Sequence, residues 1–246
     1  DQISIKPFFY PSQSVLNDIA SDAWKNTDAA LLFHAEVEIS EEAQGDKDPH
    51  DYDTFLQSRP QRMEVEAIQL VTRLQRSHPS VRCHIVHLTA ADALPIIRDA
   101  KAAGLKLTVE TCFHYLTFIS SDVPSGHPEF KCCPPIRDES NREELWQALA
   151  DGTIDFVVSD HSPCVASLKM VDDGNFMKAW GGVSGLGLGL SALWTGAKQR
   201  GHSISKVIEW TSHNTAVHAR LADRKGRIEK GLDADLIIWD PNGKTE

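Results

Sequence analysis

The 246-residue sequence contains no run of about 18 or more apolar residues and no signal-peptide pattern at its start. We therefore expect no membrane partner and a cytoplasmic location. Basic residues are in the minority, because 25 Lys and Arg stand against 35 Asp and Glu and give a net charge of -10. A general nucleic-acid-binding protein would need a basic surface, so we also expect no nucleic-acid partner.

Cysteine is scarce and its spacing excludes two common uses. The five cysteines are an odd number, and no two of them have the CxxC spacing of a zinc knuckle or a redox motif. We therefore expect reduced thiols, as in an intracellular enzyme. The hydrophobic content of 41% and the charged content of 24% are ordinary for a globular protein.

From about residue 28 the sequence alternates apolar runs with segments of helical periodicity. The apolar runs predict strands, and the periodic segments predict helices. The capping box Ser140-Asn-Arg-Glu143 predicts the start of the helix that runs through Ala150. The strands are expected at residues 29–34, 81–88, 105–111, 154–159 and 235–239, and the helices at 60–75, 90–103, 140–150, about 189–201 and 203–220.

Alternating strands and helices imply parallel strands joined by right-handed crossovers. A complete (β/α)8 barrel takes about 250 residues, so the length alone would suggest a whole one. Only four barrel strands and one terminal strand are found, however. The sequence therefore predicts an α/β fold that is the C-terminal half of a (β/α)8 TIM barrel, in residues 28–222.

Three strands end in residues that bind metals. His34 ends the first strand, His87 ends the second and Asp160 follows the fourth. In an α/β barrel the carboxyl ends of the strands carry the chemistry, and imidazole and carboxylate suit Zn²⁺ or a similar divalent ion. His84 and His87 are three residues apart and face opposite sides of a strand, so we expect only His87 to reach the centre.

Each of these residues also has a structural explanation. A single histidine on an apolar strand is more often a hydrogen-bonded core residue, and an aspartate after a strand is more often a cap of the following turn. Because residues of this kind end three strands together, we weigh a metal site equally against these structural explanations.

Six segments, in this order, resemble the allantoinases, which are cyclic amide hydrolases of the amidohydrolase superfamily. The resemblance covers residues 28–241 and rests on Leu32-Phe-His-Ala-Glu36, His84-Ile-Val-His-Leu88, Glu110-Thr-Cys-Phe-His-Tyr-Leu116, Lys131-Cys-Cys-Pro-Pro-Ile-Arg-Asp138, Val158-Ser-Asp-His-Ser-Pro-Cys164 and Lys178-Ala-Trp-Gly-Gly182. It implies an amidohydrolase-type barrel, with residues 223–246 returning to the beginning of a small β-sandwich. Residues 1–27 are an N-terminal segment of uncertain assignment.

The resemblance implies a site for two divalent ions, expected to be zinc, and hydrolysis of allantoin to allantoate in purine catabolism. His34 and His87 would bind the second ion, and Asp160 would bind the first. Asp160 would also be the general base, taking a proton from the attacking water and delivering it to the leaving nitrogen. The backbone at Cys133 and the region of His161 and Ser162 would hold the cyclic ureide, and the full-length enzyme would be a homo-oligomer.

The sequence departs from the family pattern in two ligands of the metal site. It contains no HxH motif, whose two histidines would bind the first ion, and no lysine in the context expected for the bridging carboxylated residue. Lys6 is a weak candidate, since the neighbouring residues place the true equivalent before residue 1. Two alternatives therefore stay open: a catalytically incomplete or non-catalytic fragment, and another cyclic amidase such as a hydantoinase.

Overall fold

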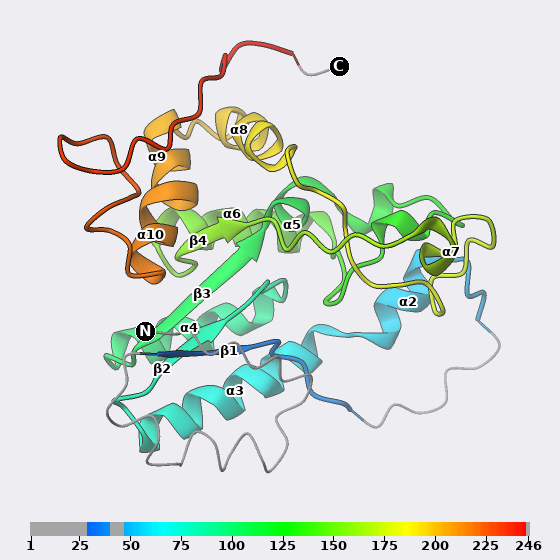
Figure 1. Cartoon of the computed structure of the whole chain (residues 1–246). Helices are drawn as coiled ribbons and strands as arrows, with labels where there is room; N and C mark the ends of the chain where they lie inside the picture. Colours follow the sequence, from blue (N-terminus) through cyan, green and yellow to red (C-terminus); the bar gives the residue numbers. More distant parts are fainter. Residues whose placement is uncertain (1–28, 40–46, 245–246) are drawn as a thin grey trace.

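The computed structural model describes residues 29–39 and 47–244. Its four strands form one parallel sheet in the order of the sequence, which is the arrangement of a partial (β/α)8 barrel (Figure 1). The strands are β1 (Ala30–Phe33), β2 (Arg82–Ile85), β3 (Leu107–Cys112) and β4 (Phe156–Val158). Three of them lie within the predicted apolar runs and β3 ends one residue beyond its run, so the predicted fold class is confirmed.

Helices fill the connections between the strands and the segment that follows β4. They are α2 (Tyr52–Ser58), α3 (Gln61–Ser77), α4 (Leu94–Ala102), α5 (Phe113–Thr117), α6 (Glu139–Asp151), α7 (Ala166–Lys169), α8 (Gly189–Gln199), α9 (Ile204–Ile208) and α10 (Asn214–His218). A π-helical turn at Glu209–His213 joins the last two. No helix among the described residues is long and apolar enough to cross a bilayer.

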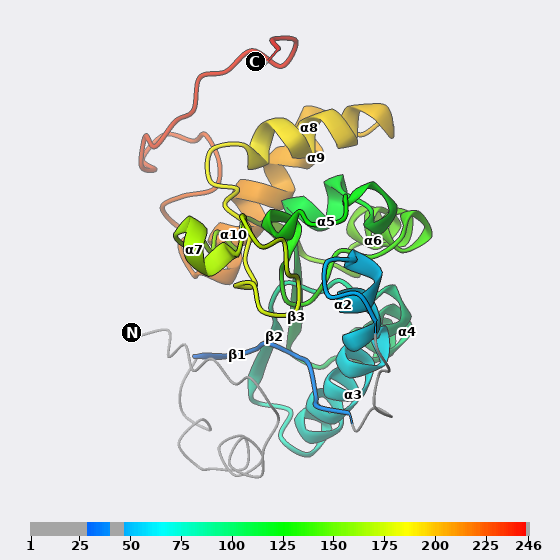
Figure 2. The same ribbon diagram turned by 90° about the vertical axis from the view of Figure 1, so that its right-hand side faces the viewer.

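Alternation along the strands separates an outer face from an inner face. Leu31, Cys83, Ile85 and Val109 are at most 2% exposed and belong to the hydrophobic core, on the side that α3 and α4 cover (Figures 1 and 2). Burying one such aliphatic side chain contributes about 1.5–3 kcal/mol, so this layer fixes the sheet on its helices. The inner face, by contrast, carries the polar residues of the candidate site.

The predicted start of α6 is wrong in one detail. The N-cap residue is Asp138, whose side-chain carboxylate accepts a hydrogen bond from the backbone N–H of Asn141 at 2.8 Å. Ser140 lies inside the helix and donates its hydroxyl to the same carboxylate. Asp and Ser are both good caps, but only Asp138 has extended backbone here, which is the conformation that an N-cap requires.

The predicted strand at residues 235–239 is also wrong. This segment has no strand partner among the described residues, and Leu236, Ile237 and Ile238 are 64%, 77% and 99% exposed. A strand needs a neighbour for its backbone hydrogen bonds, and without one the β-propensity of these residues does not suffice. The chain is instead held at Trp194 of α8, whose indole N–H donates to the Pro241 carbonyl at 2.7 Å. The sandwich assignment of residues 223–246 stays a prediction, and residues 1–27 with Lys6 lie outside the described residues.

We expect the isolated chain to self-associate through the exposed tail. A run of three exposed apolar residues at 236–238 is a surface that water disfavours. The substitution Ile238→Lys should lower the associated fraction in sedimentation velocity, whereas Val165→Lys, at a residue 63% exposed on another surface, should not. A monomeric unmodified chain would contradict this expectation.

Candidate functional site

The inner face of the sheet places three acidic and thiol groups near one edge. Glu110 and Cys112 are two residues apart on β3 and therefore point to the same side. Cys112 is paired in register with Val158 of β4, and Asp160 follows that strand, with a carboxylate oxygen within 4.8 Å of Cys112 Sγ. This edge is formed by the carboxyl ends of the parallel strands, as the sequence predicts.

His34 and His87 meet at this edge. The Nδ1 atom of His34 lies 2.9 Å from the Nε2 atom of His87, and the ring centroids are 4.6 Å apart. His87 has a φ of +42°, a left-handed conformation that non-glycine residues adopt rarely. Because β2 ends at Ile85, the alternation of the strand no longer governs where His87 points.

His87 is held as a neutral imidazole. Burial, with a smaller contribution from His34, lowers its pKa to about 3. Its Nδ1 atom is buried and has no hydrogen-bond partner. A neutral imidazole is the form that ligates a metal.

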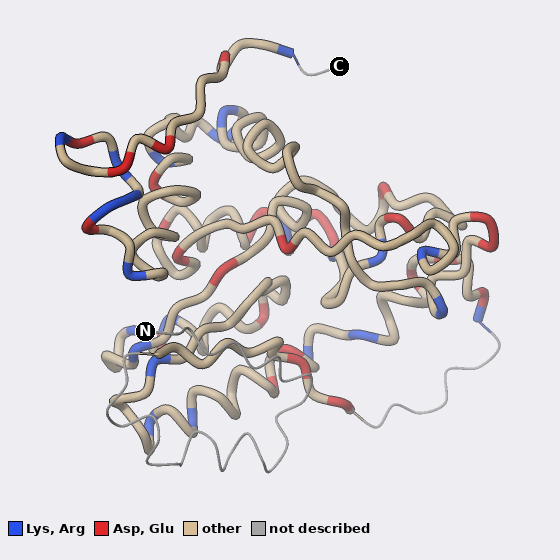
Figure 3. Tube along the Cα trace, in the orientation of Figure 1, with Lys and Arg blue, Asp and Glu red and all other residues tan. Residues whose placement is uncertain are grey.

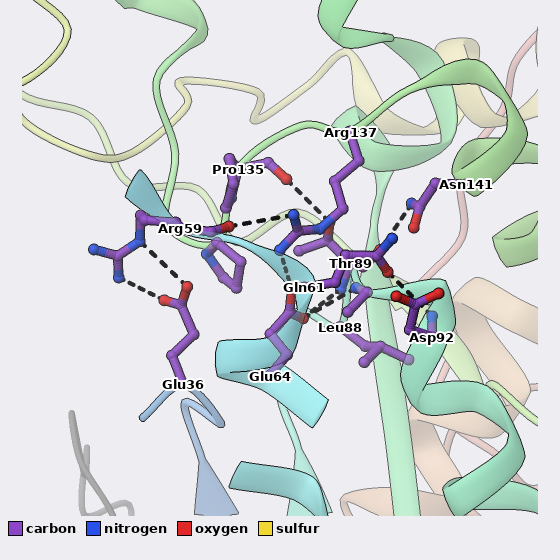
Figure 4. A network of polar contacts seen from close by, with 12 residues as sticks. Glu36, Arg59, Gln61, Glu64, Leu88, Thr89, Asp92, Pro135, Arg137 and Asn141 are labelled. Carbon is purple, nitrogen blue, oxygen red and sulfur yellow. Dashed lines mark hydrogen bonds and ion pairs between the residues drawn. The ribbon is translucent and has the colours of Figure 1, made fainter. Parts of the chain in front are cut away.

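Glu36 contacts His34 and is held in turn by Arg59, and Figure 4 shows the contact between Glu36 and Arg59. The Nε2 atom of His34 lies 2.7 Å from the Glu36 carboxylate, which also accepts two hydrogen bonds from the Arg59 guanidinium, at 2.6 and 3.2 Å. Burial alone would raise the pKa of Glu36, but the hydrogen bonds from His34 and Arg59 outweigh it and lower the pKa to about 2. Glu36 is therefore a permanent carboxylate that fixes the orientation of the His34 ring.

These contacts fit a divalent metal ion. Metal-ligating histidines almost always hold their second ring nitrogen on a carboxylate or carbonyl, and Glu36 does this for His34. The first ring nitrogen of His34 then faces His87, a second nitrogen donor of the kind that Zn²⁺ prefers.

Asp160 stands beside this pair with an unusual carboxyl group. Its φ is +42°, and burial together with the negative charge of Glu110 raises its pKa to about 6, against a smaller opposing effect of His34. A carboxyl group that titrates near neutral pH can both take up and release a proton, which is what a general base needs when it must later act as an acid.

The structure adds Cys112 and His114, two residues that the sequence analysis did not assign to the site. The Sγ atom of Cys112, a ring nitrogen of His114 and a carboxylate oxygen of Asp160 lie within 4.8 Å of one another. Cys112 could have been found from its position at the end of the third strand, at the same level as the other strand-end residues. His114 lies on α5, which begins directly after β3.

Two loops bring together the residues predicted to hold the substrate, Cys133, His161 and Ser162. Added Cβ atoms on the adjacent glycines 181 and 182 would lie 2.8 Å from Cys133 Sγ and 2.5 Å from the Ser162 carbonyl oxygen. This pair therefore packs between the two loops, at a distance that no other residue type permits.

A buried lysine fixes the same loops. The Lys169 ammonium donates to the carbonyls of Lys131, Trp180 and Gly182 at 2.8, 3.0 and 2.6 Å. Each of these carbonyls belongs to a loop next to Cys133 or Ser162. Lys169 thereby sets the separation of the two loops, although no sequence motif indicated this role.

His161 and Ser162 are held mainly by backbone contacts. The Ser162 N–H donates to the Val183 carbonyl at 3.1 Å, and the Leu186 N–H donates to His161 Nδ1 at 3.1 Å. The His161 ring therefore faces the glycine-rich segment before α8, while its backbone pairs with Val183.

Comparison with known proteins agrees with this geometry. The family model described as the amidohydrolase family matches residues 12–246. This chain belongs to the amidohydrolase family. Members of the family are typically enzymes with two metal ions.

This amidohydrolase is similar to allantoinases, as its motifs predict. It is 50% identical to the "Allantoinase, mitochondrial" of Aquarana catesbeiana over 94% of the chain, and 50% identical to the allantoinase of Streptomyces avermitilis over 86%. It covers 47% and 46% of those proteins, so the chain spans about half the length of the curated relatives it matches. A solved L-hydantoinase of Arthrobacter aurescens superimposes with a TM-score of 0.79 at 25% identity, over 94% of this chain and 53% of that one.

We expect Gly182→Ala to destabilise this amidohydrolase. The added methyl group would overlap the Ser162 carbonyl, and overpacking of this kind costs about 1–3 kcal/mol in the free energy of unfolding. Gly185→Ala is the matched control, because an added Cβ there meets nothing within 4 Å. Urea unfolding of both variants makes the comparison; equal stabilities would contradict the proposed packing.

We also expect Glu36→Gln to weaken metal binding. Removing the carboxylate that holds a metal-ligating histidine typically lowers the metal affinity by about 10–100-fold. Isothermal titration of the folded chain with Zn²⁺ measures the effect, and Glu38→Gln, at an exposed neighbouring carboxylate, serves as control. An unchanged affinity in Glu36→Gln would show that His34 does not need this partner.

Proposed function

We propose that this chain carries the second-ion histidines and the general base of an allantoinase, which hydrolyses the cyclic amide of allantoin to allantoate. The observation that carries this proposal is the contact between His34 and His87 at 2.9 Å, at the strand edge that Asp160 also occupies. The identity of 50% to curated allantoinases supports the substrate. The metal ions are proposed to be zinc, because nitrogen and carboxylate donors suit it.

The residues of the chain divide the work of hydrolysis. Bound divalent ions would lower the pKa of water and polarise the ring carbonyl. The Asp160 carboxylate takes the proton of the attacking water, and the resulting carboxylic acid gives it to the ring nitrogen as the amide bond breaks. Burial disfavours the protonated form of His87, and Glu36 fixes the orientation of the His34 ring.

The two loops at the open edge hold the ureide ring. Amide groups of the substrate need donors and acceptors in fixed positions, and the backbone at Cys133 and Ser162 supplies them. Lys169 and the two adjacent glycines keep these loops together, so the ring-binding surface is formed before the substrate arrives.

Hydantoinase activity is the second candidate function, because solved hydantoinases share the fold. The identity to them is 21–26%, against 39–50% to the allantoinases. Hydantoin and allantoin share the ring that is opened, and allantoin carries an additional ureido group. The higher identity therefore favours allantoin.

A non-catalytic fragment is the alternative from another class. The 246 residues contain no HxH motif, so two histidines that bind the first ion in this family have no counterpart in the sequence. We likewise propose that the protein is cytoplasmic and that the full-length enzyme is a homo-oligomer. The name of the frog relative assigns that protein to mitochondria.

We expect the folded, Zn²⁺-loaded chain to convert allantoin to allantoate, and Asp160→Asn to abolish the turnover. Amide substitution removes the proton acceptor, which typically costs about 100–10,000-fold in rate. Allantoate formation is measured beside hydantoin opening, and faster hydantoin opening would support the hydantoinase. No turnover in the folded, metal-loaded chain would contradict the proposal and favour the non-catalytic alternative.

A further inference from the structure

A second group of metal-binding side chains lies beside the histidine pair. Cys112 from the end of β3, His114 from α5 and Asp160 after β4 offer one sulfur, one nitrogen and one oxygen atom, all within 4.8 Å of one another. These three residues come from two strand ends and the first turn of a helix, so no short sequence motif connects them. The cluster shares Asp160 with the proposed hydrolytic site and contains neither His34 nor His87.

His114 shows that this cluster has unmet polar contacts. Its side chain is buried, and its Nε2 atom is buried without any hydrogen-bond partner. Burying such an atom without a partner costs about 1–3 kcal/mol. Burial also lowers the pKa of His114 to about 4, so the ring is neutral and has a free lone pair for a ligand.

Cys112 is fully buried, and its Sγ atom lies within 4.8 Å of a ring nitrogen of His114. Burial, Asp160 and Glu110 raise the pKa of its thiol well above the usual range, so without a bound cation the sulfur stays protonated. A thiol that coordinates a metal ion is deprotonated outright, because the ion supplies the positive charge that the site otherwise lacks. Asp160 is the exposed member of the group and gives an ion access from solvent.

We propose that Cys112, His114 and Asp160 bind a soft divalent cation, Zn²⁺ or Cd²⁺, at a site separate from the His34–His87 pair. Sulfur, nitrogen and carboxylate oxygen are the donors that these ions take in tetrahedral sites with one open position. On binding, the S–H bond of Cys112 breaks, the metal–sulfur bond forms and one proton leaves to solvent. Occupation of this site engages the Asp160 carboxylate, so an excess of such ions inhibits the proposed hydrolysis.

Cadmium titration tests this assignment directly, without reliance on hydrolytic activity. We expect the folded chain to develop one thiolate-to-cadmium charge-transfer band in the ultraviolet. Cys112→Ser should abolish the band, and Cys83→Ser should leave it unchanged, because Cys83 is an equally buried cysteine that points to the outer face of β2. His114→Gln should weaken Cd²⁺ binding by about tenfold or more.

The double variant His34→Gln/His87→Gln separates this proposal from the proposed function. The charge-transfer band should persist in it, even where hydrolysis is lost. A band that survives in Cys112→Ser, or the absence of a band in the folded unmodified chain, would overturn the assignment. If Cys112→Ser does not fold by circular dichroism, the folded His114→Gln variant decides, since unchanged Cd²⁺ affinity there would equally overturn it.

Discussion

The hydrogen bonds to the buried carboxylate of Glu64 hold together the segments at the carboxyl ends of the strands, where the candidate site lies. It is 2% exposed and accepts hydrogen bonds from the Arg137 guanidinium at 2.8 Å and from the backbone N–H groups of Thr89 and Ala90 at 2.9 and 3.1 Å (Figure 4). Helix α3, the loop after β2 and the loop that contains Pro134 and Pro135 are thereby held together by one carboxylate. Burial raises the pKa of Glu64, which Arg137 opposes. Such a pair adds little net stability, but removal of one partner costs about 3–5 kcal/mol, so it specifies the arrangement of the three segments.

This arrangement continues to the His34–His87 pair. Arg137 also donates to the backbone carbonyl of Arg59 at 3.2 Å, and the side chain of Arg59 holds Glu36, which holds His34. His34, at a strand end, is therefore connected to the core by a series of charged hydrogen bonds, each of them partly buried. Elsewhere along the described chain, Lys and Arg lie interspersed with Asp and Glu (Figure 3). Burial makes each of the charged hydrogen bonds at the site stronger than it would be in water.

The sequence predicts the strands and the residues at their carboxyl ends because both depend on local patterns. Buried parallel strands are continuous apolar runs, and the residue that follows each run reaches the same edge whatever the rest of the fold does. The cluster around Cys112 depends instead on the register between β3 and β4, which a single sequence does not contain. The segment at 235–239 fails for a related reason, since strand propensity is realised only when a partner is present. The Lys169 contacts are likewise set by tertiary structure, since its acceptors are three backbone carbonyls of distant loops.

The location of each partner explains why half of a barrel can retain an organised site. His34, its supporting carboxylate Glu36 and Arg59 all lie in the segment between β1 and α3, so these contacts come from one stretch of the chain. His87 follows on the adjacent strand, which pairs with β1 in register. Asp160, by contrast, lies within 4.8 Å of metal-binding atoms of Cys112 and His114. The proposed hydrolytic site and the proposed cluster site both use Asp160, so they compete for its carboxylate.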